Sequence, residues 1–232
     1  MAELHADLAL AHLTRAPLTE TADGAMPPLL ALLHGVGSNE RDLFRLAPEL
    51  DARWRIVSPR GPLVRGPESF AWFSFQPLPG GTVIAAEELA ASRNRLSAFL
   101  GEAVEAYNCD DERVYLLGFS QGAIVAVTLA LTQPRQLAGV VANSGRIPPE
   151  VTPLARPAEE TAGLPMLVLH GRQDAVIAVE RAHDARAILE RQRVALTYHE
   201  YDAGHQITAA MLADANAWLA AQLDEPLWDT RP

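Results

Sequence analysis

Cysteine is almost absent from this sequence. Cys109 is the single cysteine among 232 residues, which excludes an intrachain disulfide and a cysteine-based metal cluster. Asp110 and Asp111 follow it, and their negative charges disfavour the reactive thiolate form. We therefore interpret Cys109 as a structural residue.

Long apolar runs are missing as well. No stretch approaches the roughly 18 consecutive apolar residues of a membrane-spanning helix. Residues 1–7 contain neither the basic start nor the apolar core of a signal peptide. The sequence therefore predicts a cytoplasmic protein with no stable membrane insertion.

Positive charge is scarce relative to negative charge. The chain has 19 Lys and Arg residues against 29 Asp and Glu residues, so its formal net charge is -10. This balance argues against nucleic acid or an anionic membrane as the main partner. A small-molecule substrate is the expected partner, and a homodimer is left open.

Short apolar runs that end in turns alternate with helical patterns along most of the chain. The runs occupy residues 29–33, 55–58, 114–117, 139–142, 166–169 and 196–201. The helical patterns occupy residues 85–107, 121–133, 179–193 and 208–223. Near-continuous apolar strands that alternate with helices are typical of a parallel sheet covered on both faces. The sequence therefore predicts an α/β fold with a mostly parallel, doubly wound sheet and helices on both faces.

Chain length and composition indicate one domain over residues 1–232. Hydrophobic residues make up 49% of the chain, which is enough for a full α/β core. An antiparallel edge strand over residues 7–14 is a further expectation. Residues 59–81 and 146–163 are expected to be irregular, and neither segment is long enough for a large lid domain. From about residue 225 the chain has the character of a C-terminal tail.

The pentapeptide Gly118-Phe119-Ser120-Gln121-Gly122 matches the pattern G-x-S-x-G. It lies between an apolar strand and a helix, which is the setting of a nucleophile elbow. Such a turn strains the serine backbone and needs residues without bulk two positions away, which Gly118 and Gly122 provide. The alternative is a glycine-rich turn in which Ser120 caps the helix that follows.

A serine hydroxyl needs a base, and the chain offers seven histidines. His205 follows the last strand and precedes a helix, which is the final position in the order serine, acid, histidine. His34 and His170 also lie at strand ends, where roles in shaping turns or supporting the site are expected. Asp174, in the loop after the preceding strand, can orient the imidazole, and its alternative role is a helix N-cap. Asp202 competes with it but is more consistent with a turn.

Acyl transfer also requires hydrogen-bond donors for the tetrahedral oxyanion. The backbone N–H of Gln121 is one candidate because it directly follows the nucleophile. The second is the N–H of Val36, in the loop His34-Gly35-Val36-Gly37. A phosphate-binding loop is the rival interpretation, but this segment matches neither G-x-x-x-x-G-K-[ST] nor G-x-G-x-x-G.

Three aromatic residues are clustered in an otherwise proline- and glycine-rich segment. Trp72, Phe73 and Phe75 are candidates for an apolar wall that receives the acyl group of a substrate. Ordinary core packing explains them equally well. Both interpretations therefore stay open.

With these motifs in order, the chain resembles the carboxylesterase/phospholipase family of α/β-hydrolases, which includes bacterial carboxylesterases and acyl-protein thioesterases. The motifs are residues 33–37, 118–122, 170–174 and 204–205, and the likeness runs over residues 29–223. Residues 59–62 and 71–73 look like the bacterial carboxylesterase branch. Residues 38–42 are short and polar, whereas relatives that act on acylated proteins tend to carry a longer Gly- and Asp-rich stretch there.

The resemblance implies a Ser120–Asp174–His205 triad, an oxyanion hole from Val36 and Gln121, and hydrolysis of carboxylic esters without metal or cofactor. The expected function is a serine carboxylesterase that acts on small to medium acyl esters through an acyl-enzyme intermediate. Alternatives within the family are an acyl-protein thioesterase and a lysophospholipase. Further alternatives are acyl transfer to another acceptor, peptide hydrolysis, and a non-catalytic binding module that keeps only the fold.

Overall fold

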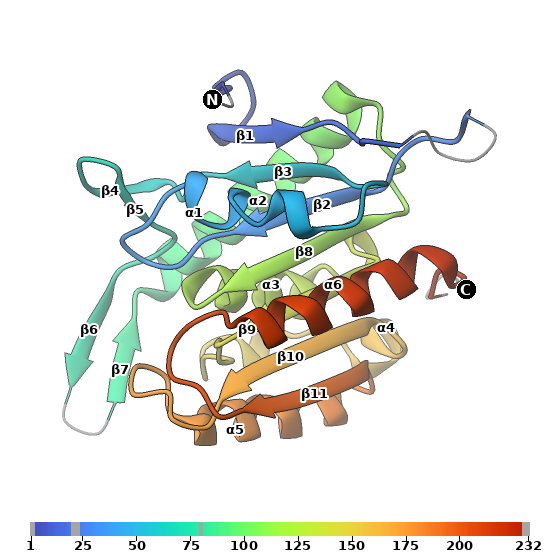
Figure 1. Ribbon diagram of the computed structural model, residues 1–232. Coiled ribbons are helices and arrows are strands. Elements are labelled where there is room, and N and C mark those ends of the chain that lie inside the picture. Colours follow the sequence, from blue (N-terminus) through green and yellow to red (C-terminus); the bar gives the residue numbers. More distant parts are fainter. Residues whose placement is uncertain (1–2, 20–23, 79–80, 229–232) are drawn as a thin grey trace.

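A seven-stranded sheet runs through the molecule (Figure 1). In spatial order its strands are β1 (His12–Arg15), β3 (Arg55–Pro59), β2 (Leu29–Leu33), β8 (Val114–Phe119), β9 (Gly139–Asn143), β10 (Pro165–Gly171) and β11 (Ala195–Tyr201). Neighbouring strands are parallel except for β1, which pairs with β3 in the antiparallel sense. This computed structural model describes residues 3–19, 24–78 and 81–228. The predicted α/β fold with a mostly parallel sheet is confirmed.

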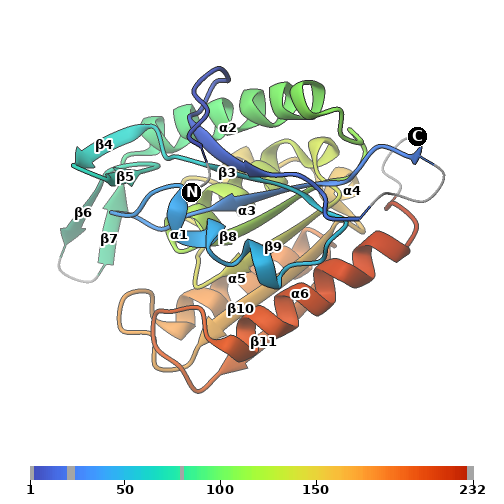
Figure 2. The same ribbon diagram turned by 45° about the horizontal axis from the view of Figure 1, so that its top comes forward.

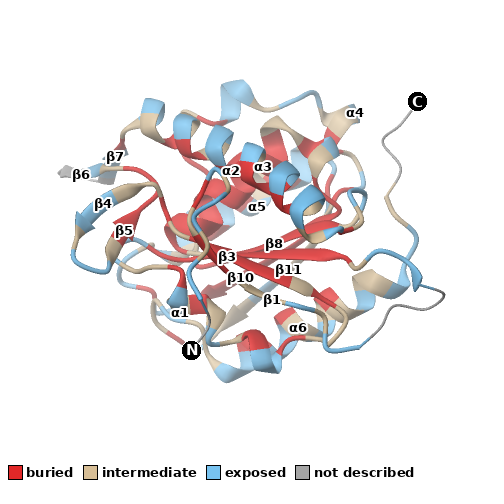
Figure 3. Ribbon diagram, turned by 90° about the horizontal axis from the view of Figure 1, so that it is seen from above, coloured by how far each residue is buried: buried red, intermediate tan, exposed pale blue. Residues whose placement is uncertain are grey.

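Helices cover both faces of the sheet (Figure 2). One face is covered by α2 (Ala86–Tyr107), α3 (Gln121–Thr132) and α5 (Val179–Arg191); the other by α1 (Arg41–Phe44) and α6 (Ala209–Asp224). Side chains of a strand alternate between the two faces, so in β2 Leu29, Ala31 and Leu33 join the first core and Leu30 and Leu32 the second. Figure 3 shows this layering as buried strands between helices whose outer surfaces are exposed.

The central helix α3 is buried on all sides. Every residue from Gln121 to Leu131 is buried, and the helix packs against β2, β8, β9 and α2. A helix that is apolar all round is typical of a protein interior. Its first turn therefore has a fixed position at the carboxyl ends of the central strands.

Residues 59–81 are more regular than expected. They contribute two antiparallel hairpins outside the central sheet: β4 (Leu63–Gly66) with β5 (Ser69–Ala71), and β6 (Phe75–Leu78) with β7 (Gly81–Ile84). The expectation of an irregular segment was wrong because proline and glycine are tolerated in short, two-stranded ribbons with open edges. Residues 79–80 lie outside the described part of the chain. Both hairpins stand beside the carboxyl ends of the parallel strands (Figure 1).

The remaining segments contain short turns. These are the 3-10 turns η2 (Ala47–Glu49), η3 (Pro134–Gln136) and η4 (Thr152–Leu154), and the one-turn helix α4 (Ala158–Thr161). Near the C-terminus, the indole N–H of Trp228 donates a 2.9 Å hydrogen bond to the carbonyl of Leu137. The expected tail from about residue 225 thus contacts the body of the protein through Trp228, and residues 229–232 lie outside the described chain. Within the described ranges, no helix has the length and apolar character required to cross a membrane.

Candidate active site

Ser120 occupies a strained turn between β8 and α3. Its φ of 54° and ψ of -117° place a non-glycine residue at positive φ. The turn brings backbones close together: a Cβ on Gly122 would stand 2.0 Å from the Leu33 carbonyl oxygen, and one on Gly118 2.5 Å from the Gly122 carbonyl. Both glycines are therefore required by the close approach of main-chain atoms.

The Ser120 hydroxyl does not cap α3. Its side chain accepts no capping hydrogen bond from the first turn, although its backbone N–H donates to the Asn143 carbonyl at 3.0 Å. The helix-capping interpretation of this serine is thus wrong. The hydroxyl instead faces the loop that follows β11.

A chain of two hydrogen bonds links three loops at the carboxyl edge of the sheet. His205 Nε2 lies 2.9 Å from Ser120 Oγ, and His205 Nδ1 lies 2.7 Å from Asp174 Oδ2. Because an ionised carboxylate only accepts hydrogen bonds, Nδ1 carries the proton in the neutral ring and Nε2 is an acceptor toward the serine hydroxyl. The carboxylate is buried, while the imidazole is 16% exposed. The structure thus brings together the three residues that the sequence predicted.

The Asp174 carboxylate is held by its own loop. Its Oδ1 accepts hydrogen bonds from the backbone N–H groups of Val176 and Ile177, both at 2.8 Å. Buried His170 donates from Nε2 to the Ile177 carbonyl at 2.8 Å and thereby fixes the same loop. The residue at the N-cap of α5 is Ala178, so Asp174 does not cap that helix.

The competing carboxylate, Asp202, has a different role. It is exposed and forms a 2.9 Å ion pair with Arg172 on the surface. Its interpretation as a turn residue agrees with this position.

Two backbone N–H groups near Ser120 have no acceptor in the described part of the protein. Among the described residues, neither Val36 N–H nor Gln121 N–H has a hydrogen-bond partner. Gln121 is the first residue of α3, where no carbonyl of the same helix is available to the N–H. Both residues line the same cleft as Ser120, which is the location expected for the two donors of an oxyanion hole.

His34 fixes the loop that carries Val36. Its Nδ1 donates to the Gly35 carbonyl at 2.7 Å, and its Nε2 accepts from Gly61 N–H at 2.9 Å. Burial lowers the pKa of His34, and the hydrogen-bond pattern requires the neutral ring, which has one donor and one acceptor. The role of His34 is therefore to fix the conformation of this loop and not to take part in the reaction.

A buried ion pair between Glu40 and Arg60 also fixes this loop. Glu40 is fully buried and accepts two hydrogen bonds from the Arg60 guanidinium, at 2.7 and 2.9 Å. Burial raises the pKa of Glu40, but the hydrogen bonds and charge of Arg60 outweigh burial, so the net pKa is lowered. Arg60 also stacks on Phe70, 4.3 Å from the ring centroid. The pair thus ties residues 34–40 to the segment before the first hairpin.

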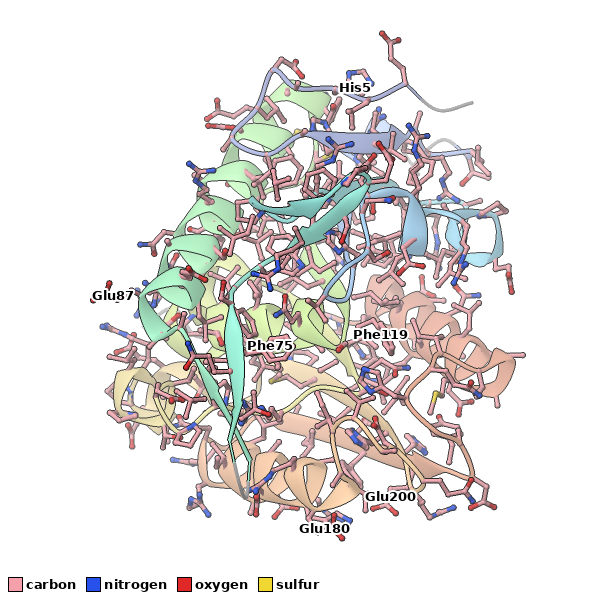
Figure 4. All side chains as sticks on the ribbon, turned by 90° about the vertical axis from the view of Figure 1, so that its left-hand side faces the viewer. His5, Phe75, Glu87, Phe119, Glu180 and Glu200 are labelled. Atoms are coloured by element: carbon pink, nitrogen blue, oxygen red, sulfur yellow. The ribbon has the colours of Figure 1, made fainter. Side chains whose placement is uncertain are left out.

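The cleft beside Ser120 has a volume of about 620 Å³. Phe73 and Phe75 line it, and Phe75 is 41% exposed. Figure 4 looks onto this edge of the sheet and shows Phe75 and Phe119 near the centre of the view. Trp72, by contrast, is fully buried outside the cleft and donates from Nε1 to the His34 carbonyl at 2.9 Å. Of the two interpretations weighed for Trp72, core packing is correct and the wall of the cleft is not.

The sequence did not predict the role of the Gln121 side chain, which is separate from that of its backbone N–H. Its side chain accepts from Trp72 N–H at 3.0 Å and donates to the Phe73 carbonyl at 2.7 Å. Sequence reasoning also missed Arg146, which lines the cleft. A signal was available for Arg146, because it directly follows the strand-end turn Asn143-Ser144-Gly145. No such local signal existed for Gln121.

No group of three or more His, Cys, Asp or Glu residues in the described ranges could hold a metal ion. The chemistry that this arrangement can perform with its own residues is nucleophilic attack by an activated serine on a polarised carbonyl.

Comparison with known proteins gives consistent results. The protein MhqD of Bacillus subtilis, named as a hydrolase, is 28% identical over 196 residues, or 84% of this chain and 94% of that protein. Acyl-protein thioesterase 1 of Eremothecium gossypii is 33% identical over 129 residues, 52% of each chain. The crystal structure of the Bacillus cereus carboxylesterase superimposes with a TM-score of 0.78 at 26% identity, covering 92% of this chain and 94% of that one.

The model of the phospholipase/carboxylesterase family matches residues 16–223, which is nearly the whole chain. This match confirms the resemblance found in the sequence and the expected class of carboxylic ester hydrolase. The chain belongs to the phospholipase/carboxylesterase family of α/β-hydrolases.

Proposed function

We propose that this protein is a serine carboxylesterase for small to medium acyl esters, with Ser120 as nucleophile, His205 as general base and Asp174 as the orienting acid. The observation that carries the proposal is the hydrogen-bond chain from Ser120 Oγ through the imidazole to the buried carboxylate, at 2.9 and 2.7 Å. Nucleophile, base and orienting group within hydrogen-bond reach are the geometric signature of an activated serine.

The first half-reaction forms an acyl-enzyme. His205 Nε2 takes the hydroxyl proton as Ser120 Oγ attacks the carbonyl carbon, and the carbonyl electron pair moves onto oxygen. The N–H groups of Val36 and Gln121 donate to that oxyanion, and the α3 dipole favours the negative charge there. Collapse of this intermediate expels the alcohol, which receives its proton from His205.

The second half-reaction releases the acid. His205 accepts a proton from water, whose oxygen attacks the acyl carbon, and the Ser120 oxygen leaves and regains its proton from the imidazolium. Asp174 stays ionised throughout and stabilises the imidazolium at each transfer.

Substitution tests the assignment directly. Ser120→Ala is expected to reduce turnover of p-nitrophenyl butyrate by roughly three orders of magnitude or more, and a fluorophosphonate probe should label the wild-type protein only. Asp174→Asn should reduce turnover on the order of 10⁴-fold, since the amide cannot hold the required tautomer. Ser97→Ala, on α2, is the matched control and should leave turnover unchanged. Turnover by Ser120→Ala near the wild-type level would refute the proposal.

A second candidate is hydrolysis of acyl thioesters, as the name of the Eremothecium gossypii relative suggests. The same serine chemistry applies to a thioester carbonyl, and apolar side chains line the cleft. Comparing kcat/KM for a thioester and an oxygen ester of the same acyl chain separates the two. A thioester preference well beyond the difference in intrinsic reactivity would reverse our ranking.

A further inference from the structure

The cleft beside Ser120 contains a cation without an anionic partner. Arg146 lines the cleft and is half-buried, and its Nη2 donates to the Thr82 carbonyl at 3.2 Å. Within the described residues, this is the only hydrogen bond of the guanidinium, and it has no ion-pair partner. Nε and Nη1 thus keep donors for a further acceptor.

The fold holds Arg146 close to the nucleophile turn. Its neighbour Gly145 packs against the first turn of α3, where a Cβ on Gly145 would stand 2.7 Å from the Ala123 Cβ. Glycine therefore lets the main chain after β9 approach the helix that begins next to Ser120. From this position the Arg146 side chain reaches β7, so it extends across the cleft from the sheet to the second hairpin.

The surrounding charges leave Arg146 only partly compensated. Burial lowers its pKa, Glu150 raises it, and Arg181 lowers it further. Glu150 lines the same cleft without an ion pair to Arg146, and its Oε2 is buried without a hydrogen-bond partner. Arg181, at the start of α5, is exposed and already paired with Asp184 at 3.1 Å. Arg146 is therefore the cation of this cleft that is free to bind an anion.

We propose that Arg146 is a specificity-determining residue that selects esters carrying a carboxylate besides the scissile ester. The inference rests on the proposed esterase function and names the substrate class of the same site. A guanidinium binds a carboxylate through paired N–H donors, and the pair gains strength where water is partly excluded. A neutral ester lacks this ion pair, so the cation in the cleft distinguishes the two kinds of substrate.

Glu150 affects how much negative charge a substrate can carry in this cleft. Its carboxylate adds a negative charge to the cleft, which disfavours a dianionic substrate more than a monoanionic one. Its unpartnered Oε2 can accept a hydrogen bond from a hydroxyl of the substrate. The chemistry thus fits a monoanionic ester, whose carboxylate belongs either to the acyl part or to the alcohol part.

Matched ester pairs test the proposal and locate the carboxylate. In the acyl arm, p-nitrophenyl hemiglutarate is compared with p-nitrophenyl valerate. In the alcohol arm, 3-carboxy-4-nitrophenyl butyrate is compared with p-nitrophenyl butyrate. The wild-type protein should favour the carboxylate-bearing ester in one arm, and Arg146→Gln should lower kcat/KM for that ester roughly tenfold or more, mainly through KM.

Controls separate this role from a structural one. The melting temperature should change little in Arg146→Gln, and the loss of kcat/KM should be much larger for the carboxylate-bearing ester than for its neutral match. Arg146→Lys should keep part of the preference because it keeps the charge. Arg186→Gln, on the exposed side of α5, changes the net charge by the same amount and should leave the ratio of carboxylate-bearing to neutral ester unchanged.

The outcomes distinguish this proposal from the underlying function. Neutral-ester turnover that Ser120→Ala abolishes supports the esterase regardless of Arg146. If that turnover is present and Arg146→Gln leaves both ratios unchanged, the assignment of Arg146 is overturned alone. If the protein hydrolyses none of the four esters, the proposed function is overturned together with this inference.

Discussion

The backbone N–H of Trp72 donates a 3.0 Å hydrogen bond to the side-chain Oε1 of Gln121. The amide nitrogen of the same side chain donates to the Phe73 carbonyl at 2.7 Å. Gln121 therefore joins two parts of the site: its main chain offers an N–H beside Ser120, and its side chain fixes the aromatic segment that lines the cleft. Since Gln121 is buried, both polar ends of its side chain need these partners.

Gln121→Glu is expected to loosen the cleft wall without removing the main-chain donor. The carboxylate can still accept from Trp72 N–H, but it cannot donate to the Phe73 carbonyl, so two acceptors face each other in a buried place. We expect a loss of stability of about 1–3 kcal/mol and a reduced kcat/KM. Urea unfolding and ester kinetics measure both, with Gln222→Glu on α6 as control. Unchanged values for both would contradict this account.

Arg60→Ala is expected to destabilise the protein through Glu40. The substitution removes the cation that is hydrogen-bonded to a fully buried carboxylate and leaves only Arg41, whose Nε is 3.7 Å from Glu40 Oε1. This loss should lower the free energy of unfolding by about 3 kcal/mol. The double variant Glu40→Gln/Arg60→Met should recover much of that loss. Urea denaturation of the single and double variants checks this, and equal stabilities of both would rule out the buried charge as the cause.

Two glycine-to-alanine substitutions should have opposite effects on the stability of the folded protein. Gly122→Ala places a methyl group 2.0 Å from the Leu33 carbonyl oxygen and should cost several kcal/mol or prevent folding. Gly101→Ala, inside α2, adds a carbon with no atom within 4 Å apart from its chain neighbours and the nearby backbone of its own helix, and should stabilise by about 0.5–1 kcal/mol. Melting temperatures test the pair, and a stable, active Gly122→Ala would argue against the close approach.

Stability should fall as the pH decreases below about 6.5, because buried histidines stay neutral in the folded state. Burial lowers the pKa of His34 and His12 from the ordinary value of 6.5, so the unfolded chain binds more protons in this range. Each histidine contributes a slope of at most about 1.4 kcal/mol per pH unit. Urea unfolding between about pH 5 and 7.5 measures the effect.

Variants assign the pH effect to these residues. His34→Gln should reduce the slope of the unfolding free energy against pH by the contribution of one histidine. His199→Gln, at an exposed position on β11, is the control and should leave this slope unchanged. If the free energy of unfolding of the wild-type protein does not change over this pH range, the account of His34 as a buried, neutral histidine is refuted.

The carboxyl-edge position of the site could be predicted from the sequence. Parallel strands end at one edge of the sheet, so the turns after three apolar runs bring Ser120, Asp174 and His205 to the same place. Each turn follows a run with a clear apolar pattern, and the chain order of the three residues matches the fold. Local signals were therefore sufficient for this part.

The contacts between residues 34–40 and 60–73 could not be predicted. Glu40 lies in a polar stretch and has the sequence signature of a surface residue, and its two hydrogen bonds from Arg60 account for its burial. The direction of the Trp72 side chain likewise depends on a partner, His34, that is 38 residues away. Such polar contacts over long sequence distances leave no periodicity in either segment.

The hydrogen-bond chain of the site is assembled from segments on both sides of an exposed turn. Arg193, in the turn between α5 and β11, is exposed at φ 58°. A main-chain break there would leave Ser120 and Asp174 on one fragment and His205 on the other. Neither fragment alone could carry out the proposed proton transfer, so a chromogenic ester would turn yellow only after the two reassociate. The fold thus offers a natural dividing point for a split reporter, in which the proximity of two fused proteins is read as colour.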